Sequence, residues 1–366
     1  MRRFTLIPVL VLLTLMMAII PVQAAEREPA TPEFTMQQAV EKAMFLNKGL
    51  KSSQYDADRS EEVRDYVSDK VEYNATGPAP NSKAESLVIS DVQAGINASM
   101  AKKNLMVQQD SVVMSVYNAY DTILQAQEKV KVAELTLKQK DWLKRMALVG
   151  QKVGTVDIMA VVQATTNYES AKSSLEAAKK ALDDDYQKFN QLVGLWPDDR
   201  PVLVTIPEIT PLEVANLDYE VAKALDVSPT VWSAQRKIDL AKLTKQLYDF
   251  TDSNSEPYKV KQIDVEKAEV AATDTKDSVS KLVRTLYYSA KQLEEQYAGS
   301  QESLRLAEES QRVAKVKFEV GMATNTELLE AELGLAQAKQ SLLNISCQHE
   351  IQVMAFKKPW AYSSGS

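Results

Sequence analysis

Residues 318–332 read FEVGMATNTELLEAE, and this stretch decides how the chain folds. Helix-forming residues stand on both sides of Val320-Gly321. Glycine readily adopts the left-handed backbone conformation that ends a helix, so Gly321 predicts a reversal of the chain. The same pair of residues recurs as Val153-Gly154. The sequence therefore predicts two long antiparallel helical hairpins, each turning at a glycine.

The segments that flank these glycines have the apolar period of coiled coils. After Gly321, leucine, isoleucine and alanine recur at alternating spacings of three and four residues. The series is Leu328, Ala331, Leu335, Ala338, Leu342 and Ile345. A period of 3.5 residues over several heptads indicates a coiled-coil seam, and prolines are absent from residues 81–196 and 258–358. We therefore expect an all-α fold built from long antiparallel coiled-coil hairpins.

The two hairpins are related by an internal repeat. Gly154 and Gly321 align at an offset of 167 residues, whereas residues 39–43 (AVEKA) and 220–224 (EVAKA) align at an offset of 181. The difference of 14 residues places an insertion in the first half, which we expect to be a short irregular or β segment. The expected insertion covers about residues 66–97, with short strands at 67–73 and 87–96.

These boundaries give an expected domain organisation. It comprises a signal peptide at 1–24, a first helical repeat at 25–195, a proline-rich linker at 196–216, a second helical repeat at 217–358 and a C-terminal tail at 359–366. The first repeat is expected to hold helices near 36–66, 98–152 and 156–193. The second is expected to hold helices near 217–252, 258–320 and 322–356.

The N-terminus has the pattern of an export signal. Arg2 and Arg3 precede an apolar run from Phe4 to Ile20, and Ala24 ends a small-residue cleavage pattern. This arrangement predicts a secretory signal peptide, with an uncleaved membrane anchor as the alternative.

Composition restricts the function classes. The net charge of −7 argues against nucleic-acid binding, which calls for a basic surface. One cysteine and one histidine, Cys347 and His349, provide too few ligands for a zinc cluster, so we interpret them as packing and surface residues. From the sequence we therefore predict that the protein is not an enzyme, and we expect neither catalytic or metal-binding residues nor a cofactor.

Three stretches together resemble the TolC family of outer-membrane efflux proteins. They are residues 34–43 (FTMQQAVEKA), 153–157 (VGTVD) and 318–332. The resemblance implies a homotrimer whose helices enclose a tunnel, in the outer membrane and periplasm. It also implies two partners, a periplasmic adaptor (membrane fusion protein) and an inner-membrane pump, with the protein as passive exit duct. Residues 251–257 are too short for two membrane strands, so we expect little or no β-barrel.

The resemblance also implies site residues. Carboxylates six and nine residues after the second turn glycine line the family's tunnel constriction, and these positions are Glu327 and Glu330. An ordinary solvated helix flank is the alternative. The candidate residues for docking the adaptor are at the hairpin turns, namely Val153, Gly154, Val320, Gly321 and Met322. The alternative function is a coiled-coil scaffold or adaptor-like protein of the cell envelope that transports nothing.

Overall fold

The structure is a computed structural model that describes residues 30–74, 82–248 and 256–363. The predicted signal peptide lies outside these residues. The described elements follow the order β1 (Glu33–Phe34), α2 (Met36–Leu46), α3 (Lys48–Asn74), α4 (Ser82–Lys152), α5 (Ile158–Val193), β2 (Val202–Leu203), α6 (Leu217–Val227), α7 (Pro229–Gln246), α8 (Tyr258–Glu319), α9 (Asn325–Lys357) and α10 (Pro359–Ser363). The prediction of an all-α fold made of long helical hairpins is confirmed.

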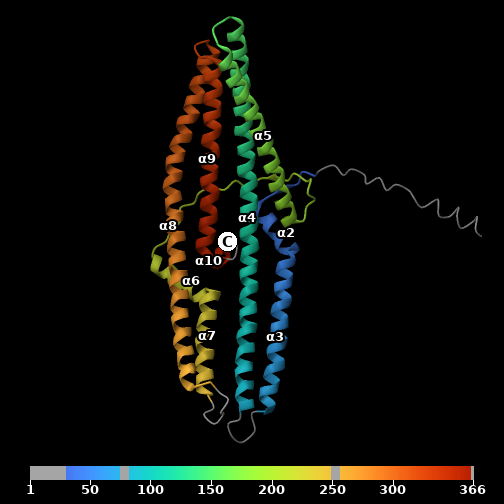
Figure 1. Ribbon diagram of the computed structural model, residues 1–366, viewed down its shortest axis with the longest axis vertical. Coiled ribbons are helices and arrows are strands. Elements are labelled where there is room, and N and C mark those ends of the chain that lie inside the picture. The colour runs from blue at the N-terminus through green and yellow to red at the C-terminus, as the bar shows by residue number, and fades with distance from the viewer. Residues whose placement is uncertain (1–29, 75–81, 249–255, 364–366) are drawn as a thin grey trace, which may run out of the picture.

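The helices form an elongated wall. Helix α4 has 71 residues and α8 has 62, and both run along most of the molecule (Figure 1). At about 1.5 Å per residue, α4 is about 105 Å long. The shorter helices pack beside them, so that the order across the wall is α5, α4, α9, α8 near the hairpin turns and α3, α4, α7, α8 at the other end. One edge of the wall is therefore α5 with α3, and the other is α8.

Two helices expected to be continuous are each broken. The predictions of single helices at 36–66 and 217–252 are wrong, because the chain leaves the helical conformation at Asn47 (ψ 114°) and Ser228 (ψ 122°). Proline at position 229 disfavours helical backbone at Ser228. At Asn47 the side-chain oxygen accepts a hydrogen bond from the N–H of Leu50 (2.8 Å), which starts the next helix.

The helix boundaries show the internal repeat. Helix α6 begins and ends 181 residues after α2, and α9 begins 167 residues after α5. These are the two offsets found in the sequence, so the two halves have one topology.

The predicted short strands are wrong. Residues 67–73 belong to α3 and residues 87–96 belong to α4. The apolar side chains in and beside these segments recur at helical spacing. Val63 and Val67 of α3 line one groove with Ile89 and Ala94 of α4. Packing of α3 against α4 therefore accounts for the helical conformation of both segments. The partial alternation of apolar and polar residues in the sequence had suggested strands.

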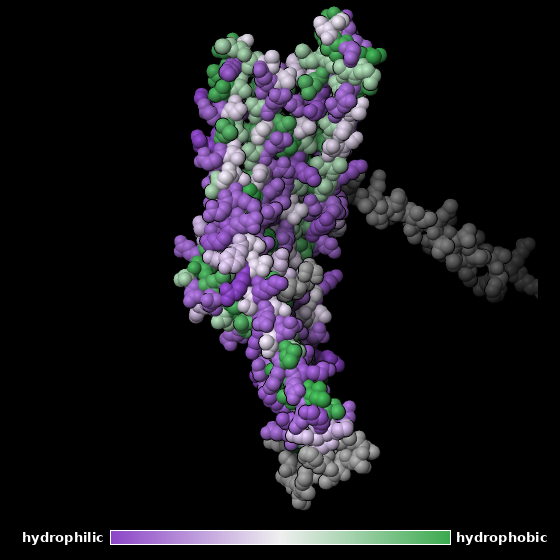
Figure 2. All heavy atoms as spheres, turned by 60° about the vertical axis from the view of Figure 1, so that its left-hand side comes forward, coloured by the Kyte–Doolittle hydropathy of each residue, from purple (hydrophilic) through white to green (hydrophobic). Residues whose placement is uncertain are grey.

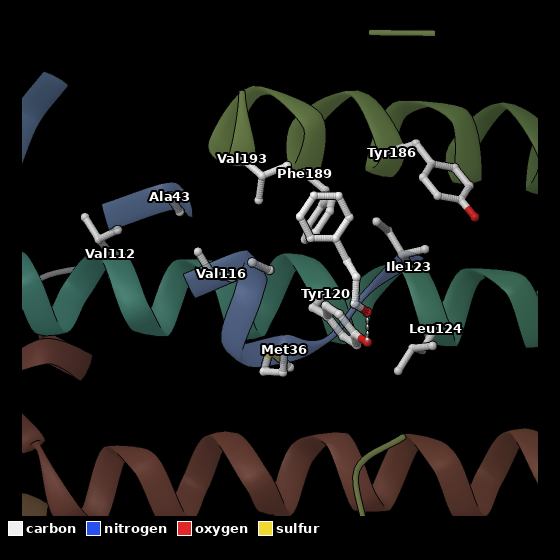
Figure 3. Packing of buried hydrophobic residues seen from close by; sticks show 12 residues of the cluster. Met36, Ala43, Val112, Val116, Tyr120, Ile123, Leu124, Tyr186, Phe189 and Val193 are labelled. Atoms are coloured by element: carbon white, nitrogen blue, oxygen red, sulfur yellow. Dashed lines mark hydrogen bonds between the residues drawn. The ribbon is translucent and has the colours of Figure 1, made fainter. Parts of the chain in front are cut away.

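A hydrophobic core lies at mid-height of the wall, where the start of the described chain packs against the segment that connects the two halves. Phe34 and Leu203 are paired in the short parallel ladder of β1 with β2. The Tyr120 hydroxyl of α4 donates a hydrogen bond to the carbonyl oxygen of Phe34 (3.1 Å) and accepts one from the N–H of Thr205 (2.8 Å). Tyr120 and Phe189 are fully buried and meet edge to face (Figure 3). Within the described residues, no helix has a stretch long and apolar enough to cross a membrane.

Candidate functional site at the hairpin tips

The two hairpin turns lie at the same end of the molecule (Figure 1). Gly154 follows α4 with φ 78°, and Gly321 follows α8 with φ 77°. The chain reverses at each glycine, as the sequence predicted. A Cβ atom added to either glycine would meet no atom within 4 Å. Glycine is therefore needed for its left-handed backbone, and close packing plays no part.

Each returning helix begins with a side-chain cap. Asp157 accepts a hydrogen bond from the N–H of Ala160 (2.7 Å) at the start of α5. At the start of α9, the hydroxyl of Thr324 accepts a hydrogen bond from the N–H of Glu327 (3.3 Å). The carboxylate of Glu327 in turn accepts one from the N–H of Thr324 (2.6 Å). This reciprocal pair is a capping box, and it fixes the backbone at the second turn.

The capping box also sets the charge of Glu327. Its pKa is below the ordinary value because the backbone N–H of Thr324 donates to the carboxylate, with smaller contributions from the Thr324 hydroxyl and the nearby Lys317. The side chain is exposed and remains a carboxylate at neutral pH. Sequence analysis missed this capping role, although Thr324 followed three residues later by Glu327 is its signature.

The second hairpin has an open groove that brings several predicted residues together. The groove has a volume of about 770 Å³ and lies between the ends of α8 and α9 next to the turn. Glu327, Glu330 and Met322 all line it, together with Lys317 of α8. The predicted constriction residues and one predicted docking residue therefore share one surface. Val153 and Gly154 lie at the other hairpin turn.

The turns expose apolar side chains. Val153 is 68% exposed, Val320 is 64% exposed and Met322 is 78% exposed. Apolar residues are interspersed with polar ones over this end, while the middle of the same face is mainly hydrophilic (Figure 2). Grouped exposed apolar side chains are typical of surfaces that contact a partner.

Comparisons with known proteins agree with this architecture. The family model described as outer membrane efflux protein matches residues 237–358. We find no match among curated protein sequences.

Several solved structures are similar over most of the chain. The outer-membrane channel OprN is 12% identical, with a TM-score of 0.64 over 89% of this chain and 90% of the channel. The outer membrane protein VceC from Vibrio cholerae is 14% identical, with a TM-score of 0.62 over 89% of this chain and 95% of VceC. The CmeC outer membrane channel of Campylobacter jejuni is 12% identical, with a TM-score of 0.63 over 93% and 90% of the two chains. The resemblance seen in the sequence is thus confirmed: residues 237–358, about a third of the chain, match the model of the outer membrane efflux proteins, and the described chain has the fold of these outer-membrane channels.

Proposed function

We propose that the protein is the exit duct of an efflux or secretion system. In this proposal three copies enclose a passive helical tunnel in the cell envelope, at the outer membrane and periplasm. A periplasmic adaptor joins the tunnel to an inner-membrane pump. The match to outer membrane efflux proteins and the fold shared with outer-membrane channels support the transport role.

The observation that carries the proposal is the pair of unlike, open edges of the wall. Exposed apolar side chains occur on both edge helices, such as Val162 on α5 (51% exposed) and Val316 on α8 (49% exposed). A surface of this kind indicates a neighbour. Because the two edges differ, the α5 edge of one copy would pack on the α8 edge of the next, and such contacts form a ring when the rotation closes. Four helical strands from each of three copies would then surround the tunnel.

The exposed turn residues support adaptor docking. Val153, Val320 and Met322 project from helix ends that the capping interactions hold in place. An adaptor with its own helical hairpins would cover them with apolar side chains of its own. In this arrangement Gly154 and Gly321 set the direction of the turns, and the neighbouring side chains supply the contact area.

Cross-linking tests the ring. Val162 and Val316 are about equally exposed and lie near the turns, on opposite edges of the wall. Within one chain α4 and α9 separate α5 from α8, so a Val162→Cys, Val316→Cys double variant can be bridged only between copies. We expect a bifunctional maleimide to give a covalent trimer in mild detergent.

Each single-cysteine variant is the control, and it should give no species larger than a dimer. The native Cys347 is buried and does not compete for the reagent. A double variant that stays monomeric, together with a monomer by light scattering, would overturn the tunnel and support the scaffold alternative.

A further inference from the structure

Two acidic side chains are buried at a place where the two halves of the chain meet. Helix α4 belongs to the first half and α9 to the second, and the two helices contact each other directly (Figure 1). Asp121 of α4 is 2% exposed, and neither of its side-chain oxygens accepts a hydrogen bond within the described residues. Glu350 of α9 likewise has a buried side-chain oxygen without a hydrogen bond there. We call residues 117–125 of α4 and 343–354 of α9 the α4–α9 joint.

Burial keeps a proton on these carboxyl groups. It raises the pKa of Asp121 to about 8, and the charge of Glu350 adds to the rise, while the Cys347 thiol, a weak donor, opposes it. Burial also raises the pKa of Glu350. A buried carboxylate without a positive partner is costly, so the packed joint favours the neutral acids. Water can solvate the charged forms only where the two helices separate.

The other ionisable groups at the joint supply no positive charge to Asp121. The thiol of Cys347 stays neutral because burial raises its pKa to about 12, and the pKa of Tyr117 is raised as well. Beside Asp121 lies a cavity of about 510 Å³, and no lysine, arginine or histidine is among its described lining residues. His349 of α9 instead contacts Glu294 of α8, which also accepts a hydrogen bond from the neighbouring lysine on the same helix.

We propose that the α4–α9 joint is a proton-dependent contact. It is packed while Asp121 and Glu350 are protonated, and it opens locally as they ionise, because hydration then becomes favourable for both groups. The first hairpin thereby becomes looser against the second as the pH rises. The joint lies within one chain, so this inference does not depend on the ring or on the cross-linking outcome.

The pKa of Asp121 sets the pH range of the effect. In the opened joint the carboxyl is in water with its ordinary pKa of 3.8, whereas in the packed joint the pKa is about 8. Between these values the packed joint retains a proton that the opened joint has lost, so each rise in pH favours opening. One proton changes the opening constant about tenfold per pH unit. The constant levels off below the lower pKa and above the higher one.

Amide hydrogen exchange of the full chain in mild detergent, from pH 5 to pH 8, tests the joint. Each rate is divided by the rate of an unstructured peptide at the same pH, which gives the opening constant. The range begins above the ordinary pKa of Glu294, 4.5, so that carboxylate stays ionised throughout. We expect the opening constant of residues 117–125 and 343–354 to rise about tenfold per pH unit.

Three variants assign the effect to the carboxyl groups. Asp121→Asn removes the titrating proton and should abolish most of the rise, leaving the joint better protected than in the wild type at pH 8. Asp121→Leu should act in the same way, which guards against a disturbance caused by the buried amide. Glu350→Gln removes the charge that helps to raise the pKa of Asp121, so the opening constant should level off at a lower pH.

Two references separate this joint from the rest of the fold. Glu128→Gln removes a carboxylate of α4 that pairs with Lys131, and it should leave the pH dependence unchanged. Residues 171–178 of α5, which bury alanine and leucine side chains, should show no comparable rise. A flat wild-type profile, or an equal rise in residues 171–178, would overturn the proposal. An Asp121→Asn profile as steep as the wild type would also overturn it and would assign the effect to His349.

Discussion

The hydroxyl of Tyr120 in the middle of α4 donates its hydrogen bond to the carbonyl oxygen of Phe34, 86 residues earlier. The same hydroxyl accepts a hydrogen bond from Thr205 on the connection between the halves. One side chain thus holds two separate chain segments against the longest helix. This contact fixes the mid-height core from which the hairpins extend (Figure 3).

Tyr120→Phe should destabilise the fold while keeping the ring packing against Phe189. The variant leaves the Thr205 N–H without its partner, while the Phe34 carbonyl keeps only the N–H of Val204 (3.1 Å). The loss should cost about 1–3 kcal/mol in the free energy of unfolding. Denaturant titration measures the change. Tyr288→Phe is the control because Tyr288 is 63% exposed, and an equal loss in both variants would contradict the assigned role.

Much of the fold could be predicted because it follows from residue type and spacing. Gly154 and Gly321 mark the turns since few other residues accept a positive φ. The 3.5-residue period of the apolar residues indicates coiled-coil packing. The helix break at Ser228 also had a signal in Pro229, whereas at Asn47 an ordinary polar residue caps the next helix and only the structure shows it.

The site was predictable only where it lies next to the turns. The positions of Glu327 and Met322 follow from their spacing to Gly321. The burial of Asp121, which is 2% exposed where α4, α8 and α9 meet, was missed because it depends on which faces of three distant helices meet, and spacing along one helix carries no such information. For the same reason the sequence could not decide whether His349, interpreted with Cys347 as packing and surface residues, lies inside or outside. It is 3% exposed, with its Nε2 atom 3.4 Å from the carboxylate of Glu294.

Substitution of the turn glycines should cost stability for a backbone reason alone. Gly154→Ala or Gly321→Ala places a Cβ on a left-handed residue, which costs about 1–2 kcal/mol in the free energy of unfolding. The matched control is Gly299→Ala in the exposed interior of α8, where the same change should stabilise by up to about 1 kcal/mol. Thermal unfolding of the three variants gives the comparison. Similar effects at all three positions would show that left-handed strain is not the cause.

Acid should weaken the fold partly through Glu294 of α8. Burial raises the pKa of this carboxyl, but hydrogen bonds from Lys291, the N–H of Leu212 and His349 outweigh burial, so the net pKa lies below the ordinary 4.5. A group with a lowered pKa contributes stability above 4.5, and that contribution is lost as pH falls through the folded-state pKa. Glu294→Gln should therefore flatten the loss of unfolding free energy on acidification.

Denaturant titrations from neutral pH to below the ordinary pKa measure this effect. Glu295→Gln is the control, because Glu295 is the exposed neighbour of Glu294 on the same helix. If the Glu294→Gln protein loses stability on acidification as steeply as the wild type, the proposed linkage is absent.

The C-terminal helix α10 should depend on Asp110 of α4. Its carboxylate accepts hydrogen bonds from the indole N–H of Trp360 (2.7 Å) and from the Lys358 ammonium. Asp110→Ala should cost about 1–3 kcal/mol, mainly from the indole donor, since the half-exposed Lys358 adds little. We expect faster amide hydrogen exchange in residues 359–363. Asp110→Asn keeps an acceptor oxygen and should show a smaller increase, and unchanged exchange in both variants would rule out this anchor.

The carboxylates of the groove give the sharpest test of a cation-binding constriction. Glutamine can take the place of glutamate in a capping box, so Glu327→Gln removes the charge while keeping the turn at Thr324. Glu330 is exposed, and Glu330→Gln likewise changes charge with little effect on the fold. In a trimer each substitution removes three charges. A carboxylate about 4 Å from a cation contributes about 1 kcal/mol in water, so each variant should weaken multivalent cation block by at least about tenfold.

Single-channel current in planar bilayers, with a multivalent cation added to one side, measures this block. Glu319→Gln removes an exposed charge at the end of α8 outside the groove lining and should leave the block unchanged. The double variant Glu327→Gln, Glu330→Gln should conduct normally and resist the block most. If that protein is blocked at the wild-type cation concentration, Glu327 and Glu330 belong to an ordinary solvated helix face, and the second turn retains only its capping role and its proposed docking role.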